Sequence, residues 1–308
     1  EDVALPMIAK QVGTPAYIYS TASMRRQTVA LKTALQPVGD PLIAYAVKAN
    51  PNAAILATFA AEGLGADVVS GGEYLRARAA GIAPEKIVFS GVGKTEEEMM
   101  IALQGGLFEF NLESIEEAEM LSQVALSLGT VAPVAIRVNP DVDAGSHPKI
   151  STGSARNKFG VSIGKAVDAY EQLGALAGLR PRGVAVHIGS QLTNLDVLEA
   201  AFAMVGDLIA KIRERGFDVE TVDLGGGLGI NYDPQCKPAP SPAEYGAMIA
   251  RVTAGWNVRL IVEPGRLLVG EAGVLLTRVI RVKAGAVHPF VILDAGMNDL
   301  MRPALYDA

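Results

Sequence analysis

The sequence predicts an α/β protein: a (β/α)8 TIM barrel followed by an incomplete β-rich second domain. Short β-rich runs alternate with stretches whose apolar residues recur at helical spacing, and polar residues gather where the runs end. Strand-helix alternation implies parallel pairing with right-handed crossovers, and eight such units across about 220 residues match the size of a barrel. A doubly wound open sheet is the alternative fold.

The predicted strands are short and apolar, and the predicted helices carry start signals such as Ser114 followed by Glu117. The barrel strands are predicted at 43–47, 66–70, 87–90, 107–111, 134–139, 183–188, 221–224 and 259–262. The helices are predicted at 53–62, 72–80, 95–104, 114–127, 165–177, 195–215 and 242–253. We assign residues 20–266 to the barrel. Residues 1–19 plus 267–308 form the second domain, with strands at 16–19, 273–282 and 290–293.

The composition is typical of a globular protein that acts on a small molecule. Of 308 residues, 50% are hydrophobic, and the net charge of −6 argues against nucleic acid as a partner. A single cysteine, Cys236, excludes an internal disulfide framework and fits a cytoplasmic location. No uninterrupted apolar run reaches the length of about 18 residues that a membrane span needs. The sequence lacks a starting methionine, and we expect both ends to be truncated relative to the gene product.

Lys48 follows the apolar run at residues 42–47 and precedes the turn signal Asn50-Pro51. Burial at a strand end lowers the pKa of an ammonium, and a neutral amine can attack a carbonyl to form a Schiff base. The alternative is a lysine whose side chain reaches solvent from the strand end. The other strand-end residues favour the reactive lysine.

Two further segments follow the last two predicted barrel strands. Three glycines, Gly225, Gly226 and Gly227, let backbone N–H groups approach an anion, and the loops after strands seven and eight of a barrel are a favoured phosphate site. A tight turn is the alternative role. Glu263 follows the eighth strand, where a buried carboxylate needs either Arg266 or a cationic ring nitrogen of a cofactor as its partner. Arg266 could instead bind a substrate carboxylate.

His187 ends the sixth strand beside a Gly-Ser turn, where it could stack on a flat ring, transfer a proton or serve as a core residue. The three histidines, His147, His187 and His288, are far apart in the sequence, so we predict no metal site. The connection at 140–164 is long and aperiodic, and we expect a lid or mouth loop there.

Over essentially the whole chain, these segments resemble the pyridoxal-phosphate-dependent decarboxylases of the alanine-racemase fold type. The matching motifs are YAVKAN at 45–50, SGGE at 70–73, RVNPD at 137–141, NKFG at 157–160, HIGSQ at 187–191, the glycines at 225–227, EPGR at 263–266 and DAGMNDLMRPALY at 294–306. Gln191 and the run at 297–306 look specific to the diaminopimelate decarboxylase branch of that family.

The resemblance implies a role for each candidate site residue. Lys48 holds the pyridoxal 5'-phosphate and releases it to the substrate amine, His187 stacks on the pyridine ring, and Glu263 pairs with the ring nitrogen. Asp67 supports the site from the second strand. The phosphate is held by Ser190, Gly225, Gly226 and Gly227, with backbone near Gly265 and Arg266. The distal end of the substrate, a second carboxylate, is bound by Arg266, Arg302 and Tyr306.

The implied reaction is decarboxylation of meso-2,6-diaminopimelate to L-lysine and CO2, the last step of lysine biosynthesis, by a homodimer with shared active sites. A decarboxylase for a related basic amino acid or carboxynorspermidine stays open, as does a non-catalytic cofactor-binding protein. Family members continue with β-domain residues that supply a Cys, a Glu and a Tyr, which are not present up to Ala308, and Cys236 does not match that cysteine.

Overall fold

The computed structural model describes residues 1–142, 158–232 and 238–306. Its internal contacts divide the chain into two compact units, one formed by Glu1–Met24 with Glu271–Ala308 and the other by Arg25–Gly270. Helix α2 (Thr21–Leu35) runs through the division, which falls a few residues after each boundary predicted from the sequence. We refer to the two parts as the terminal unit and the barrel unit.

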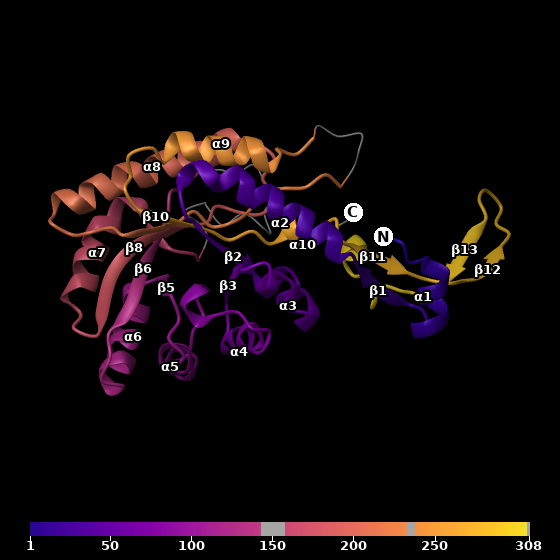
Figure 1. The fold of residues 1–308 in the computed structure, drawn as a ribbon, viewed down its shortest axis with the longest axis horizontal. Helices are drawn as coiled ribbons and strands as arrows, with labels where there is room; N and C mark the ends of the chain where they lie inside the picture. The colour runs from indigo at the N-terminus through magenta and orange to yellow at the C-terminus, as the bar shows by residue number, and fades with distance from the viewer. Residues whose placement is uncertain (143–157, 233–237, 307–308) are drawn as a thin grey trace. The chain divides into compact units, whose positions relative to one another are not determined.

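The described part of the barrel unit contains eight parallel strands that close on themselves (Figure 1). Their order is β5 (Glu109–Leu112), β4 (Ile87–Phe89), β3 (Gly65–Val68), β2 (Leu42–Ala46), β10 (Arg259–Val262), β9 (Thr221–Asp223), β8 (Leu179–Val186) and β6 (Ala132–Asn139). Pairing of β5 with β6 closes the barrel, and the two-residue strand β7 (Val161–Ser162) adds to the end of β6. The predicted (β/α)8 barrel is confirmed.

Helices surround the barrel, and their ends carry the capping signals that the sequence contains. They are α3 (Ala53–Ala61), α4 (Gly71–Ala79), α5 (Glu96–Gln104), α6 (Ile115–Ser127), α7 (Ala166–Ala175), α8 (Leu195–Glu214), α9 (Pro242–Val252) and the short α10 (Arg266–Val269). Thr95 with Glu98 and Ser241 with Glu244 form reciprocal capping boxes. Helix α2 was not predicted from the sequence, because one of its four buried positions, 24, 28, 31 and 35, is a threonine.

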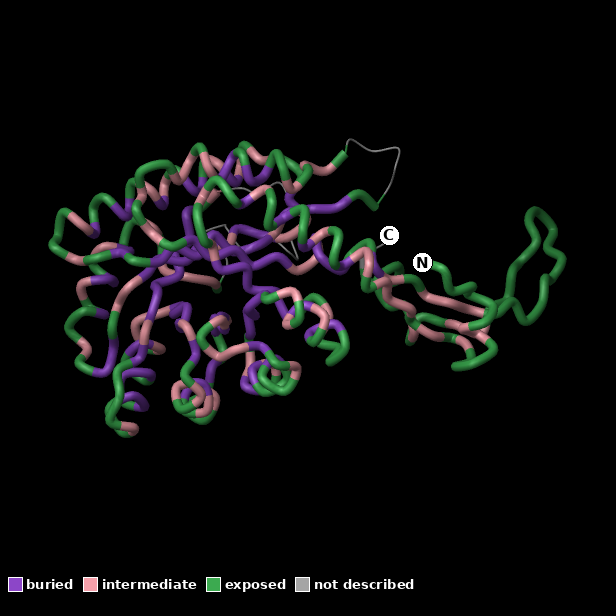
Figure 2. Tube along the Cα trace, viewed as in Figure 1, coloured by how far each residue is buried: buried purple, intermediate pink, exposed green. Residues whose placement is uncertain are grey.

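Most residues of the barrel strands are buried (Figure 2), and hydrogen bonds across the interior show which side chains point inward. Asn111 and Glu109 on β5 bond to Asp223 and Thr221 on β9, although β5 and β9 are not neighbours in the sheet. An apolar cluster also packs between strands: Leu42, Ala44, Val88 and Ile261. The interior therefore combines an apolar layer with polar side chains, and the polar ones continue toward the ends of the strands.

The terminal unit contains two small antiparallel sheets. Strand β1 (Ala16–Tyr19) pairs with β11 (Gly273–Leu276), which confirms that the N-terminal run adds a strand to this unit. The predicted strand at 273–282 is instead two strands, β11 and β12 (Val279–Lys283). The two are separate because β11 pairs with β1, whereas β12 pairs with β13 (Phe290–Leu293). Two short helices, α1 (Leu5–Val12) and α11 (Arg302–Tyr306), complete the unit. Among the described helices of the whole chain, none has the length and apolar character needed to cross a membrane.

Candidate active site

Lys48 and Asp67 form an ion pair at the C-terminal end of neighbouring barrel strands. Lys48 lies in the 3-10 turn Val47–Ala49 after β2, and Asp67 lies on β3. The distance from Lys48 Nζ to Asp67 Oδ2 is 2.5 Å; the Asp67 side chain is fully buried and that of Lys48 is 46% exposed. Burial lowers the pKa of Lys48, but Asp67 and Glu263 together raise it above its ordinary value. The expected lowering of this pKa is wrong, because the two carboxyl groups outweigh the effect of burial.

Glu263 follows β10 and lies at the end of a buried hydrogen-bond network. Ser90 Oγ donates to Glu263 Oε1 at 3.3 Å, and Asn111 Nδ2 lies 3.1 Å from Ser90 Oγ and 2.8 Å from Asp223 Oδ2. Burial raises the pKa of Glu263 well above its ordinary value, and the nearby carboxyl groups of Asp223 and Asp67 raise it further. Within the described residues no ion pair joins Glu263 to Arg266, so the structural pair considered from the sequence does not form.

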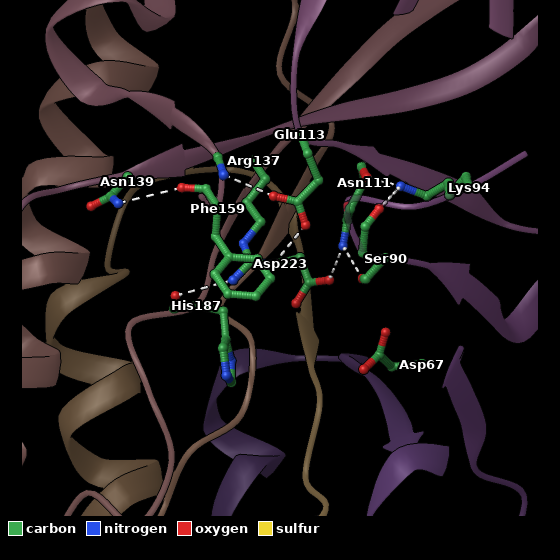
Figure 3. A network of polar contacts seen from close by, with 12 residues as sticks. Asp67, Ser90, Lys94, Asn111, Glu113, Arg137, Asn139, Phe159, His187 and Asp223 are labelled. Carbon is green, nitrogen blue, oxygen red and sulfur yellow. Dashed lines mark hydrogen bonds and ion pairs between the residues drawn. The ribbon is translucent and has the colours of Figure 1, made fainter. Parts of the chain in front are cut away.

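His187 directly follows β8 and is neutral in this environment. Burial lowers its pKa well below the ordinary value, and the charges of Arg137 and Lys48 lower it further. The backbone N–H of Gly226 donates to His187 Nδ1 at 3.2 Å, so Nδ1 is the acceptor and the ring proton lies on Nε2. Arg137 donates to Glu113 Oε1 at 2.7 Å and to the His187 carbonyl at 3.4 Å (Figure 3). The Gly226 N–H therefore favours one tautomer of the imidazole, and Arg137 anchors the backbone of His187.

The glycine run packs against backbone rather than lining an open surface. A Cβ on Gly226 would lie 2.1 Å from the Glu263 carbonyl oxygen, and one on Gly227 would lie 2.4 Å from the Gly189 carbonyl oxygen. The N–H groups of Gly225 and Gly226 donate within the protein, to Asp223 Oδ1 and His187 Nδ1. The run is therefore a tightly packed turn, and its role toward a phosphate stays a prediction.

Arg266 begins α10 and reaches the two side chains beside it. Its Nη2 donates to Ser190 Oγ at 3.3 Å and its Nη1 to the Tyr232 hydroxyl at 2.5 Å. Arg266 Nε is buried and has no hydrogen-bond partner among the described residues. Gly265, which precedes it, approaches the side chains of Ala46 and Ala49 closely enough that an added Cβ would lie within 3.2 Å of both.

The remaining predicted residues belong to the terminal unit or lie outside the described residues. Arg302 and Tyr306 are the first and last residues of helix α11 in the terminal unit, and the Tyr306 side chain is not described. Cys236, His147 and most of the predicted mouth loop at 140–164 lie outside the described residues. In the described ranges, no group of three or more His, Cys, Asp or Glu side chains could hold a metal ion.

Ser90 and Asn111 end the predicted strands at 87–90 and 107–111, but no role was predicted for either residue. Asp223 and Glu113 were not predicted as site residues. The missed signal is the alternation of side chains along a strand. Asp223 lies two residues before Gly225, and Glu113 lies two residues after Asn111, so both share the inward face of a known strand-end residue.

Residues 21–270 match the family described as pyridoxal-dependent decarboxylase, pyridoxal binding domain. The curated diaminopimelate decarboxylase of Zymomonas mobilis is 56% identical over the whole of this chain and 74% of its own length. That of Neisseria meningitidis serogroup B is 46% identical over the same shares. The chain belongs to the diaminopimelate decarboxylase family. It spans about three quarters of the length of these relatives.

Solved structures agree with this membership of the diaminopimelate decarboxylases. The diaminopimelate decarboxylase of Helicobacter pylori complexed with L-lysine matches with a TM-score of 0.94 and 39% identity, covering 99% of this chain and 76% of that one. The enzyme of M. jannaschii in complex with L-lysine matches with a TM-score of 0.92 and 38% identity, covering 98% and 72%. A lysine/ornithine decarboxylase of Vibrio vulnificus, 22% identical with a TM-score of 0.83, shares the fold alone.

As a member of this diaminopimelate decarboxylase family, the chain is a pyridoxal-phosphate-dependent decarboxylase. Its site suits an aromatic, anionic cofactor. Asp67 Oδ1 and Arg266 Nε are buried without hydrogen-bond partners among the described residues, and each matches a group of opposite character on such a cofactor. His187 is neutral and can therefore face a ring without introducing a charge.

Proposed function

We propose that the C-terminal end of the barrel binds pyridoxal phosphate through Lys48 and there removes CO2 from meso-diaminopimelate to give L-lysine. The observation that carries this proposal is the convergence of three charged or protonatable side chains on Lys48: Asp67 at 2.5 Å, Glu263 and His187. An amine held between carboxyl groups at the mouth of a barrel is suited to bind a carbonyl compound covalently.

Lys48 has to lose a proton before its amine can bind the cofactor's carbonyl carbon. Asp67 Oδ2 already accepts a hydrogen bond from Lys48 Nζ, so it is the proton acceptor in reach. Because Asp67 is fully buried, its charge acts on Lys48 with little screening by water. Asp67 therefore both holds the lysine in place and takes part in its deprotonation.

His187 and Glu263 orient the ring of the cofactor. The neutral imidazole of His187, fixed by the Gly226 N–H, stacks on one face of the ring, and Glu263 pairs with the ring nitrogen. When bound, the cofactor supplies an electron sink for the electron pair left behind as CO2 departs. A carboxyl group fixed at the ring nitrogen keeps that nitrogen protonated, and the sink depends on that proton.

Ser190, Arg266, Gly265 and the run of Gly225, Gly226 and Gly227 are proposed to bind the cofactor's phosphate. The Ser190 hydroxyl and the Arg266 guanidinium already contact one another, and both can donate to an anion. Gly227 packs against the loop that carries Ser190, which brings the third part of this site to the same place.

Arg266, Arg302 and Tyr306 are proposed to bind the distal end of the substrate, which bears a second amino-acid group. An arginine fork binds a carboxylate through two parallel hydrogen bonds, and this selects diaminopimelate over diamine precursors that lack the second carboxylate. We further propose a cytoplasmic homodimer with shared active sites, acting in the last step of lysine biosynthesis.

The test is a visible absorbance spectrum of the purified protein with pyridoxal phosphate, followed by meso-diaminopimelate and detection of CO2. We expect the band of a lysine-bound cofactor and release of gas, and borohydride reduction should trap the cofactor on the peptide that contains Lys48. Lys48→Ala should lose the band and turnover while keeping its circular dichroism. Lys86→Ala is the matched control, because Lys86 Nζ donates to the Gly63 carbonyl and is not part of this cluster.

A band that survives in Lys48→Ala would remove Lys48 from its role. A band without gas, on this chain, would leave cofactor binding in place and contradict decarboxylation by residues 1–308 alone.

A further inference from the structure

Asp223 is a buried carboxyl group to which the roles proposed above assign no function. It is 1% exposed, and both of its oxygens accept hydrogen bonds at 2.8 Å, Oδ1 from the Gly225 N–H and Oδ2 from Asn111 Nδ2. Asn111 also contacts Ser90, whose hydroxyl donates to Glu263. The side chains of Asp223 and Glu263 hydrogen-bond to each other as well. Asp223 is therefore linked to Glu263 directly and through two neutral side chains.

Two carboxyl groups can form a hydrogen bond only when one of them carries a proton. Burial raises the pKa of both carboxyl groups, while the bond between them lowers the pKa of Asp223 and raises that of Glu263, so we place the proton on Glu263 and make Asp223 the acceptor. Asp223 already receives two other donors, which stabilise its charged form, whereas the Glu263 side chain receives the Ser90 hydroxyl alone among the described residues. Other ionisable groups act on this pair or line the same small cavity: Lys48, Asp67, Arg137, His187 and Tyr245.

We propose that Asp223 is a positioning residue that holds Glu263 in place and shares one proton with it, so that the cofactor's ring nitrogen meets a carboxyl group that is already oriented and protonated. This rests on the proposed pairing of Glu263 with the ring nitrogen. When the cofactor binds, the Oε–H bond of Glu263 breaks and an N–H bond forms on the ring. Asp223 stays charged throughout, and its negative charge favours the protonated ring nitrogen.

The first test uses infrared spectroscopy on the cofactor-free protein, where a protonated carboxyl group gives a carbonyl stretch that a carboxylate lacks. Glu109→Gln is the background, because burial raises the pKa of Glu109 to about 7 and that residue would add a band of its own. At mildly alkaline pH we expect a protonated-carboxyl band in the background protein. Adding Glu263→Gln should remove it, and adding Asp223→Asn should move its disappearance to lower pH. A band whose pH of disappearance is unchanged by Asp223→Asn, or no such band in the background protein, overturns the shared proton.

The second test is an equilibrium titration of the cofactor-free variants with pyridoxal phosphate. Asp223→Asn should weaken binding by about tenfold to a hundredfold, the value of one hydrogen bond to a charged group. Thr221→Val is the matched control, because it removes the parallel bond from β9 to β5 one layer away, at Glu109, and leaves Glu263 untouched. We expect its dissociation constant to stay within about twofold of the wild-type value. Equal losses in the two variants would reduce Asp223 to a structural residue.

Ser90→Ala covers the case in which Asp223→Asn does not fold. It should keep the infrared band but weaken pyridoxal phosphate binding, because the proton stays in the pair while Glu263 loses a hydrogen bond that orients it. Wild-type affinity in Ser90→Ala contradicts the positioning role. If the wild-type chain itself binds no pyridoxal phosphate, the proposed function fails, and the infrared band still decides the shared proton.

Discussion

Thr221 donates a hydrogen bond to Glu109 at 2.7 Å across the barrel interior, joining β9 to β5. The second oxygen of Glu109, Oε1, has no hydrogen-bond partner among the described residues, and Arg182 Nε lies 3.4 Å from Oε2. Burial raises the pKa of Glu109 to about 7, although Thr221 and Arg182 act in the opposite direction. A carboxyl group unused by the proposed chemistry therefore titrates near neutral pH inside the barrel.

Glu109 should make the stability of the barrel fall as pH rises. Its pKa in the folded chain lies above the ordinary value of 4.5, so the folded state holds the proton more tightly, and the resulting stability is lost as pH rises toward about 7. The loss is on the order of 3 kcal/mol, from about 1.4 kcal/mol per pKa unit. Urea unfolding at a series of pH values measures it, and Glu109→Gln should flatten the slope. Glu171→Gln, which alters the exposed partner of Arg215, should leave the slope in place. A slope unchanged by Glu109→Gln contradicts this assignment.

Asp67→Asn should make Lys48 a more reactive amine. Asp67 raises the pKa of Lys48, and without that charge a larger fraction of Lys48 is the free amine at neutral pH, about tenfold more for each pKa unit lost. The measurement is the rate at which an amine-selective reagent labels Lys48 in the cofactor-free protein, followed by peptide mass spectrometry. Lys86 in the same sample is the internal reference and should react at an unchanged rate. Equal labelling of Lys48 in both proteins would mean that Asp67 does not control its charge.

Gly226→Ala should destabilise the chain and weaken cofactor binding together. The new methyl group would lie 2.1 Å from the Glu263 carbonyl oxygen, so the backbone that carries Glu263 must move. Forced overpacking of this kind costs about 1–3 kcal/mol. Chemical unfolding and a pyridoxal phosphate titration measure the two effects. Gly93→Ala is the control, since its Cβ would meet nothing within 4 Å, and a Gly226→Ala protein as stable as that control would refute the steric argument.

Arg302→Ala should raise the KM for diaminopimelate and leave the cofactor spectrum unchanged, because the guanidinium is proposed to bind the substrate's second carboxylate and not the cofactor. The loss should correspond to about 2 kcal/mol or more, as for removal of a bidentate charged pair. Steady-state kinetics measures it. Arg281→Ala, an exposed arginine of β12 in the same unit, serves as the control. Unchanged substrate affinity in Arg302→Ala refutes the assignment to the distal carboxylate.

The repeating part of the fold could be predicted from the sequence because its signals are local. Short β-rich runs located the barrel strands, helical spacing located the helices between them, and Ser and Thr caps located helix starts to within a residue or two. Helix α2 was missed because buried Thr28 weakens its apolar face. The prediction of one strand over residues 273–282 was wrong because a change of pairing partner leaves no mark in composition.

The candidate site was predictable only where it lies at strand ends. Lys48, His187 and Glu263 could be found there, whereas the Asn111–Asp223 bond joins residues 112 positions apart and depends on closure of the barrel. The predicted direction of the Lys48 pKa shift was wrong for the same reason. Burial can be read from an apolar run, but the opposing charge of Asp67 depends on which strand lies beside β2.

The bonds from β5 to β9 also bear on how this chain folds during synthesis. Glu109 and Asn111 are synthesised long before their partners Thr221 and Asp223. The interval between the synthesis of β2 and that of its partner β10 is longer still. Until then the first half of the barrel presents inward-facing polar groups that only later segments can satisfy, so it gains little from closing early. The nascent polypeptide should therefore stay open until β9 and β10 have been translated, and chaperone contact should concentrate on the stretch from β2 to β6.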